Sequence, residues 1–159
     1  MGLRLKNQEF GECFFVTTSF KDHAPLGNHA GVYEILATAV NFQIDEIDAK
    51  LIAYVFMPTH LHLLLAINGR KLSDFIRDFK KYTSQKALNK CCPSQKAWQQ
   101  RYDRQAIWSE NVLKTKIDYI HNNPLKAGLV ARPEYWYWSS AADYLGRDKG
   151  PLAIWKEWY

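Results

Sequence analysis

Apolar residues follow two different periods along the chain, and the period distinguishes expected strands from expected helices. Residues 13–19 (CFFVTTS) are aromatic and β-branched, which favours a first strand. Residues 50–57 (KLIAYVFM) and 60–67 (HLHLLLAI) are two apolar runs on either side of Pro58-Thr59. Two such runs around a short turn containing proline predict an antiparallel hairpin at the centre of a sheet.

Three further segments have apolar residues at helical spacing. Residues 30–42 are apolar at positions 32, 35, 36, 39 and 40, which predicts a helix. Residues 72–88 predict a second helix, whose apolar stripe contains Leu72, Phe75, Ile76 and Phe79. Ser109 is suited to cap a third helix over residues 110–122. We expect that helix to end before Asn123-Pro124, because a residue that precedes proline disfavours helical geometry.

The order of these elements indicates the fold class. A strand, a helix, a strand pair and a helix are followed by an extended aromatic segment at residues 97–108 and then by the third helix. This order predicts an α+β, ferredoxin-like sandwich with a central antiparallel sheet and helices packed against it. No linker interrupts the pattern, so we expect residues 1–159 to form one catalytic domain, with the Trp- and Tyr-rich tail packed over the sheet.

The chain is basic in its middle third. Its formal net charge is +5, but residues 70–104 contain ten Lys or Arg against three Asp, a local excess of +7. Such a local excess is typical of proteins that bind polyanions, although a solvated lysine-rich helix face accounts for it equally well. The six Trp, nine Tyr and eight Phe can fill a core or stack on nucleic-acid bases, and composition alone does not decide between these roles.

The cysteines and the hydropathy indicate the compartment. Cys13 and the adjacent pair Cys91-Cys92 form an odd set without CxxC spacing, which argues against a disulfide framework. No apolar run is as long as a membrane span. We therefore expect a soluble protein of the reducing cytoplasm with no membrane partner.

His60 and His62 are the first candidates for chemistry. Side chains two apart in a strand point to the same face, so both imidazoles can reach one divalent cation. A pair of hydrogen-bonded histidines in a sheet is the alternative. The apolar surroundings favour the metal site, because a buried imidazole needs a partner.

The third helix provides a second candidate group. Tyr119 and Asn123 are four residues apart and share one face, with Lys116 within reach. The apolar seam lies about a quarter-turn away at Leu113, Ile117 and Ile120, an arrangement that holds Tyr119 out of the core. Simple packing is the alternative for any one of nine tyrosines. Together, a metal-polarised phosphate and a tyrosine nucleophile would give a covalent phosphotyrosine.

Several motifs in the sequence resemble one known family. Residues 55–65 (VFMPTHLHLLL) resemble the His-hydrophobe-His motif of the small single-tyrosine transposases. Residues 119–130 (YIHNNPLKAGLV) resemble the tyrosine-helix signature of the REP-associated branch of this family, which acts at repetitive extragenic palindromes. Residues 135–140 (YWYWSS), residues 72–83 (LSDFIRDFKKYT) and Trp98-Gln99 also match the family's pattern.

The resemblance implies roles for individual residues. His60 and His62 become ligands of Mg²⁺ or Mn²⁺, Asn123 becomes the third ligand, and Tyr119 becomes the nucleophile in preference to Tyr82. The implied reaction is a transesterification on single-stranded DNA beside a hairpin, which yields a 5′-phosphotyrosine and a free 3′-hydroxyl. The family includes dimers that exchange the tyrosine helix as well as enzymes considered monomeric, so a homodimer and a monomer are both compatible with the sequence.

Candidate DNA contacts follow from charge and aromaticity. We expect Arg77, Lys80 and Lys81 on the second helix to contact phosphates, together with Lys116 on the third helix. Trp98 and Tyr102 are candidates for stacking on unpaired bases, as is Trp108, although packing in the core is the better explanation for at least one of the three.

Two other functions remain open at this point. One is a ferredoxin-like protein that binds nucleic-acid hairpins without catalysis, which explains the charge but not the histidine and tyrosine set. The other is a zinc site formed by His60, His62 and either Cys91 or Cys92, although this spacing matches no familiar zinc pattern.

Overall fold

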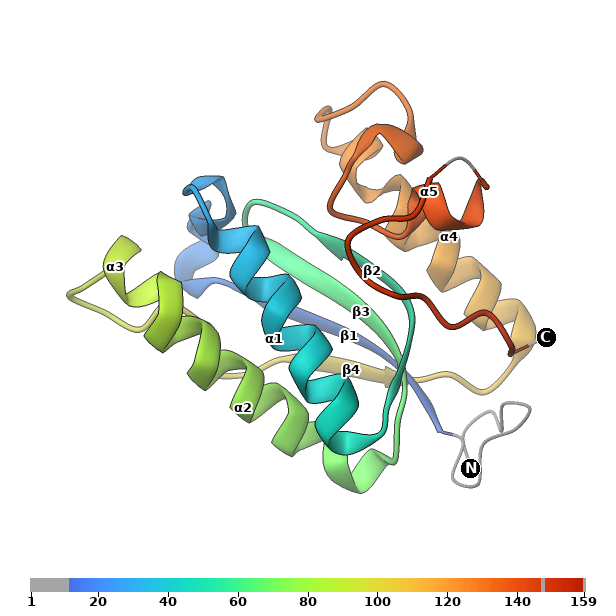
Figure 1. Ribbon diagram of the computed structural model, residues 1–159, viewed down its shortest axis with the longest axis horizontal. Helices are drawn as coiled ribbons and strands as arrows, with labels where there is room; N and C mark the ends of the chain where they lie inside the picture. The colour runs from blue at the N-terminus through green and yellow to red at the C-terminus, as the bar shows by residue number, and fades with distance from the viewer. Residues whose placement is uncertain (1–11, 147, 159) are drawn as a thin grey trace.

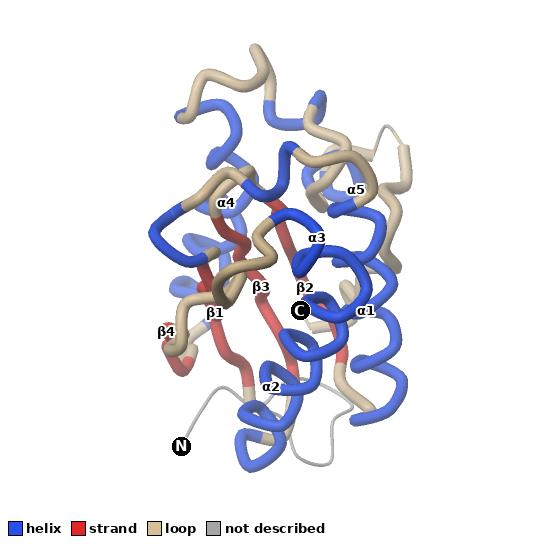
Figure 2. The backbone as a smooth tube through the Cα atoms, turned by 90° about the vertical axis from the view of Figure 1, so that its left-hand side faces the viewer, coloured by secondary structure: helices blue, strands red, loops and turns tan. Residues whose placement is uncertain are grey.

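Four antiparallel strands form one sheet in the order β2-β3-β1-β4. The structure is a computed structural model that describes residues 12–146 and 148–158. The strands are β1 (Cys13–Ser19), β2 (Lys50–Phe56), β3 (His60–Ala66) and β4 (Asp103–Ala106). Figure 2 shows them side by side, with β4 at one edge and β2 at the other.

The helices complete the predicted ferredoxin-like arrangement. Helix α1 (Val32–Ile47) connects β1 to β2, and α2 (Leu72–Thr83) lies between β3 and β4. A β1-α1-β2-β3-α2-β4 order with β1 and β3 at the centre of the sheet is the ferredoxin-like topology. The fold class expected from the sequence is therefore confirmed.

Both faces of the sheet are covered, which explains the continuous apolar character of its central strands. Leu61, Leu63 and Leu65 of β3 pack in the core beneath α1 and α2. The alternate residues of β3 face α4 (Glu110–Lys126) on the other side, where Leu64 and Ala66 join a second core cluster. Figure 1 shows α1 and α2 together on one side of the sheet and α4 on the opposite side.

Helix α4 continues through Pro124, so the prediction that it ends at Asn122 was wrong. Proline cannot donate the usual bond within the helix, but the ladder resumes because the Ala127 amide donates to the carbonyl of Asn123. Packing also offsets the local cost, since Pro124 and the predicted seam of Leu113, Ile117 and Ile120 are buried. Asn123 therefore lies within the helix, one turn after Tyr119.

The second helix is also shorter than the periodicity predicted. Helix α2 ends at Thr83 and is followed by a π-helical turn (Ser84–Leu88) and by α3 (Asn89–Cys91). Of residues 97–108, only β4 pairs with β1. Short 3-10 turns occupy Lys21–His23, Leu26–Asn28, Gly69–Lys71 and Pro133–Tyr135.

The C-terminal segment covers the outer edge of β2. Ser139 forms a bridge with Val55, and the Phe56 amide donates to the carbonyl of Trp138 over 2.8 Å. A final helix, α5 (Ala141–Tyr144), follows directly. This segment gives the exposed edge of β2 backbone partners and holds the tail beside α4. Among the described residues, no helix combines the length and the apolar character needed to cross a membrane.

Candidate active site

Strand β3 and helix α4 bring the predicted catalytic residues together. His60 and His62 point to the face of the sheet that α4 covers, and their ring centroids lie 4.8 Å apart. The ring of Tyr119 lies 5.4 Å from the ring of His62 and meets it edge-on. Residues more than fifty positions apart in the sequence therefore form one cluster.

His62 is buried, and within the described part of the chain only one of its two nitrogens has a hydrogen-bond partner. Nδ1 lies 2.8 Å from the hydroxyl of Thr17, its direct neighbour across the β1–β3 ladder. Nε2 is buried and has no hydrogen-bond partner among the described residues. Burial lowers the pKa of His62 to about 3, helped by the charges of His60 and Lys116, so the ring is neutral at pH 7.

His60, the first residue of β3, has a similar arrangement. Its Nδ1 lies 2.9 Å from the hydroxyl of Thr59, and its ring makes a polar contact with the side chain of Asn123. Burial lowers the pKa of His60, while the Asn123 contact acts in the opposite direction and the charge of His23 lowers it further. A neutral imidazole again results, with a lone pair available to a metal.

These residues fit a divalent cation. A buried nitrogen without a partner, such as Nε2 of His62, requires an explanation, and an ion that lies against it provides one. The described residues contain no cluster of three His, Cys, Asp or Glu side chains that could hold a metal. Any third protein ligand would then be of another type, and the side chain of Asn123, which contacts His60, could supply an amide oxygen.

Tyr119 lies at the edge of this cluster and is open to solvent. Its side chain is 43% exposed, which agrees with the expectation that the apolar seam holds it out of the core. Two ammonium groups flank its ring, since Nζ of Lys116 lies 5.7 Å and Nζ of Lys126 lies 5.9 Å from the ring centroid. The side chain therefore combines access to solvent with positive charge nearby.

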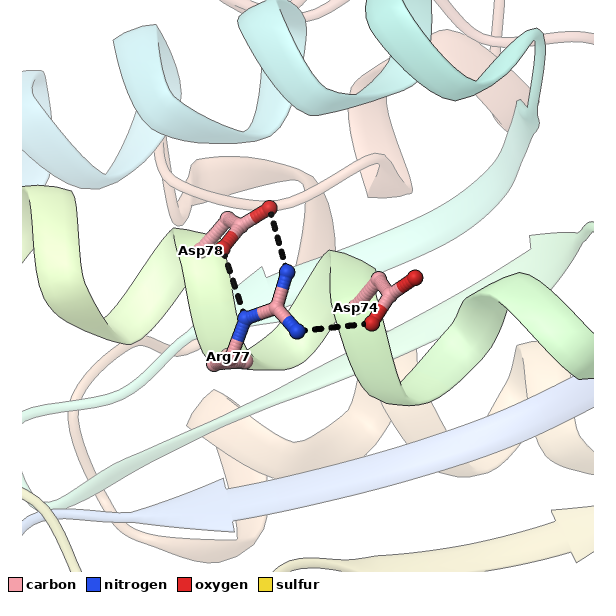
Figure 3. Close-up of polar contacts among 3 residues, drawn as sticks. All are labelled: Asp74, Arg77 and Asp78. Carbon is pink, nitrogen blue, oxygen red and sulfur yellow. Dashed lines mark hydrogen bonds and ion pairs between the residues drawn. The ribbon is translucent and has the colours of Figure 1, made fainter.

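The basic helix α2 lies on the opposite face of the sheet from this cluster. Arg77 is held by two carboxylates, with Nη1 2.8 Å from Asp74 and Nε 2.9 Å from Asp78, as Figure 3 shows. The ammonium group of Lys80 is half-buried and donates to the carbonyl of Gln99 over 2.8 Å. Lys81 is exposed. Of the four predicted phosphate contacts, only Lys116 lies beside Tyr119.

Trp98 is a core residue, so the expectation that it stacks on bases must be corrected. Its side chain is 5% exposed, and its indole N–H donates to the hydroxyl of Thr83 over 3.0 Å. The rings of Phe20 and Phe79 pack against it at 4.6 and 5.5 Å. A base would find no accessible ring face there.

Tyr102 lies beside a cavity of about 420 Å³ that reaches the active-site side of β1. The cavity is lined by Thr17, Ser19, His23, Gln99, Gln100, Arg101, Tyr102 and Asp103. Thr17 therefore links this cavity with His62. Tyr102 itself is half-buried, with Nζ of Lys80 5.8 Å from its ring.

Sequence reasoning did not identify Thr17, Thr59 or His23 as site residues. Thr59 had a local signal, because it directly precedes His60 in the PTHLH motif. Thr17 had none, since its contact with His62 depends on the register between two strands 45 residues apart. His23 has a left-handed backbone with φ of 52°, which is uncommon outside glycine although histidine adopts it more readily than most residues, and it follows Asp22 in the same conformation.

The zinc alternative does not agree with the geometry. Cys91 and Cys92 pack against the core cluster beneath α1 and α2, whereas His62 faces α4. The sheet therefore separates these cysteines from the histidine pair.

A family model for IS200-like transposases matches residues 16–123, which extend from β1 to Asn123 in α4. The chain belongs to this family. The matched residues of this IS200-like transposase include both histidines, Tyr119 and Asn123. No curated protein matches the chain significantly.

Two solved structures share the fold of this IS200-like transposase. One is a REP-associated tyrosine transposase bound to a REP hairpin, with a TM-score of 0.74 and 22% identity over 100% of this chain and 91% of the other. The second is a putative transposase from Deinococcus radiodurans, with a TM-score of 0.52 and 18% identity over 76% of this chain and 96% of the other. At these identities the likeness concerns the fold.

Proposed function

We propose that this IS200-like transposase is a metal-dependent nickase and strand transferase of the REP-associated type, acting on single-stranded DNA beside a hairpin. One observation carries the proposal. A solvent-exposed tyrosine lies 5.4 Å, ring to ring, from a buried histidine whose Nε2 has no partner among the described residues. A nucleophile next to an imidazole nitrogen that could bind a cation is the pairing that metal-assisted phosphoryl transfer needs.

The reaction is a balanced exchange of one phosphodiester for another. The Tyr119 oxygen forms a bond to phosphorus, and the bond from phosphorus to the 3′-oxygen of the preceding nucleotide breaks. The proton that Tyr119 loses is balanced by the one that the departing 3′-oxygen gains, which leaves a 5′-phosphotyrosine and a 3′-hydroxyl. A cation held by His60, His62 and Asn123 would supply charge stabilisation for the scissile phosphate.

The remaining residues orient the substrate. Lys116 and Lys126 flank the Tyr119 ring, so their charges attract the phosphate to the nucleophile. The cavity beside Thr17 and His23 adjoins the histidine pair and has the volume to hold a nucleotide next to the cleaved bond. The structural relative bound to a REP hairpin supports a DNA hairpin as the substrate.

One chain supplies every member of the candidate site. Helix α4 packs on the sheet of its own chain, so Tyr119 meets His62 without a second protomer. We infer that a monomer is sufficient for the first cleavage.

The test is covalent capture of DNA. Wild-type protein is incubated with Mn²⁺ and end-labelled hairpin oligonucleotides that carry single-stranded arms, and the products are separated on a denaturing gel. We expect a protein–DNA adduct that Tyr119→Phe abolishes and that the matched control Tyr82→Phe, on the opposite face of the sheet, retains. Hairpin binding without any adduct, over a wide panel of arms, would instead identify a non-catalytic hairpin-binding protein.

A further inference from the structure

Exposed aromatic side chains gather around the tyrosine helix. In the part of the chain that the structure describes, five aromatic residues are exposed: Phe42, Trp108, Tyr119, Tyr135 and Tyr137. All except Phe42 lie between positions 108 and 137, in α4 or the segments that flank it. Trp98, which charge and sequence position suggested for base stacking, is not among them.

The two tyrosines after α4 alternate with two anchored tryptophans. Tyr135 and Tyr137 are 57% and 62% exposed, whereas Trp136 and Trp138 are half-buried between and after them. The indole N–H of Trp136 donates to the carbonyl of Phe56 over 2.9 Å, and the Trp138 ring packs against Tyr33 at 5.5 Å. Tryptophan anchors of this kind hold the neighbouring backbone in place and restrict the position of both tyrosines.

This anchored segment adjoins the candidate active site. Backbone pairing runs across the sheet from Thr17 to His62, from His62 to Val55 and from Val55 to Ser139. Two strand spacings, about 10 Å, therefore separate the backbone of His62 from that of Ser139, which follows Tyr137 by two residues. A stacked DNA strand advances about 3.4 Å per nucleotide, and an unpaired strand can extend further, so this separation corresponds to at most about three nucleotides.

Resting on the proposed function, we propose that Tyr135 and Tyr137 form a stacking platform for unpaired bases of the DNA strand that enters the active site. Every base has a face that can stack on an aromatic ring, whichever base it is. Arg132, whose guanidinium lies 5.9 Å from the Tyr135 ring and is paired with Glu134, adds a cation at the edge of the platform. The short backbone path from His62 through Val55 to Ser139 places this segment near the site proposed to hold DNA, which favours DNA over a protein as the occupant.

The experiment uses the full chain in a Tyr119→Phe background, so that binding is measured without cleavage. The probes are DNA hairpins with single-stranded thymine arms. Each probe of the series carries one 2-aminopurine, placed at a different position of the arm. Stacking of 2-aminopurine on a tyrosine ring quenches its fluorescence, so the quenched positions identify the bases that lie on the platform. We expect Tyr135→Ala with Tyr137→Ala to relieve that quenching and to weaken binding of the armed hairpin about tenfold or more. The variant Tyr137→Phe, which keeps the ring, should bind as the background protein does.

The matched control is Phe42→Ala, because Phe42 is 59% exposed and belongs to α1 on the other side of the sheet. Its affinity should not change, and blunt hairpins without arms should bind all variants equally. Unchanged affinity and unchanged quenching in the double variant would contradict the platform proposal. So would a Tyr119→Phe protein that binds no hairpin with single-stranded arms. The proposal would also be wrong if the protein formed a concentration-dependent dimer that the same two substitutions dissociate. Tyr135 and Tyr137 would then form a contact between two copies of the chain.

The adduct assay separates this proposal from the proposed function. If the otherwise wild-type chain forms the adduct while the double variant binds DNA normally, the platform is wrong and the nickase remains. If binding depends on the two tyrosines but no adduct forms, the platform holds and the nicking activity fails.

Discussion

The hydroxyl of Thr17 lies 2.8 Å from Nδ1 of His62, while Nε2 of the same ring is buried without a partner among the described residues. A partner at one imidazole nitrogen selects the tautomer and fixes the ring plane, and so decides which nitrogen a metal meets. Thr59 has the same relationship to His60 at 2.9 Å. If Nδ1–H of each histidine donates a hydrogen bond to its threonine hydroxyl, the two Nε2 atoms carry the lone pairs that would bind a metal.

Removal of the Thr17 hydroxyl should therefore weaken metal binding. We expect Thr17→Val to lower Mn²⁺ affinity roughly 10- to 100-fold, because a ligand histidine loses the group that orients it. Thr17→Ser should restore most of the affinity. Titration of free Mn²⁺ followed by electron paramagnetic resonance measures this directly, without any DNA.

The neighbouring threonine is the control for this substitution. Thr18 is the next residue of β1 and is buried, whereas Thr17 is half-buried, but the Thr18 side chain points to the opposite face of the sheet and its hydroxyl has no partner among the described residues. Thr18→Val should leave Mn²⁺ affinity unchanged and cost no stability. Equal affinity in the Thr17 and Thr18 variants would contradict a positioning role for Thr17.

Phosphate attraction should depend on which face of the sheet a cation occupies. Lys116 lies beside Tyr119, so Lys116→Met should weaken DNA binding and reduce the slope of log affinity against log salt by about 1. Arg77→Met, on the opposite face and already paired with Asp74 and Asp78, should change neither. Fluorescence anisotropy over a salt series measures both quantities, and a larger effect from Arg77 would move the DNA path to α2.

Stability should fall as the pH decreases below about 6.5 in metal-free protein. Burial lowers the pKa of His62 to about 3 and that of His121 to about 4, whereas both rings titrate near 6.5 in the unfolded chain. Below 6.5 the unfolded state therefore binds protons that the folded state excludes. The free energy of unfolding should decrease by up to about 1.4 kcal/mol per pH unit for each histidine.

Urea denaturation at several pH values between 6.5 and 5, with a chelator present, measures this slope. His121→Asn should remove the contribution of His121, up to about 1.4 kcal/mol per pH unit. A slope that does not respond to this substitution would mean that other groups cause the pH dependence.

Ser140 should be important for holding the tyrosine helix on the sheet. Its hydroxyl lies 2.8 Å from Nε2 of His121 in α4 and accepts the amide of Tyr54 in β2 over 3.0 Å. Ser140→Ala leaves both buried groups without this partner, so it should destabilise the fold by about 1–3 kcal/mol.

A double-mutant cycle with His121→Ala isolates the His121–Ser140 contribution. We expect a coupling energy of about 1 kcal/mol from chemical denaturation. Additive effects would show that the two residues stabilise the protein independently.

Much of the fold could be predicted from the sequence because its signals are local. The apolar runs before and after Pro58-Thr59 became β2 and β3, and the stripe of Leu72, Phe75, Ile76 and Phe79 became the buried side of α2. Local rules failed at Pro124, where packing of α4 on the sheet outweighed the proline's effect on the helix. The extended character expected for residues 97–108 became a strand, β4, where this segment pairs with the edge of β1.

The candidate site, too, could be predicted from the sequence only in part. The sequence by itself determined that His60 and His62 share a face and that Tyr119 and Asn123 share another, because strand and helix periods are properties of the backbone. Only the tertiary structure decided that these faces meet, that Thr17 lies behind His62, and that Trp98 is enclosed while Tyr135 and Tyr137 are exposed. Those relationships depend on strand register and on the packing of distant segments, and such long-range contacts leave no periodic trace in the chain.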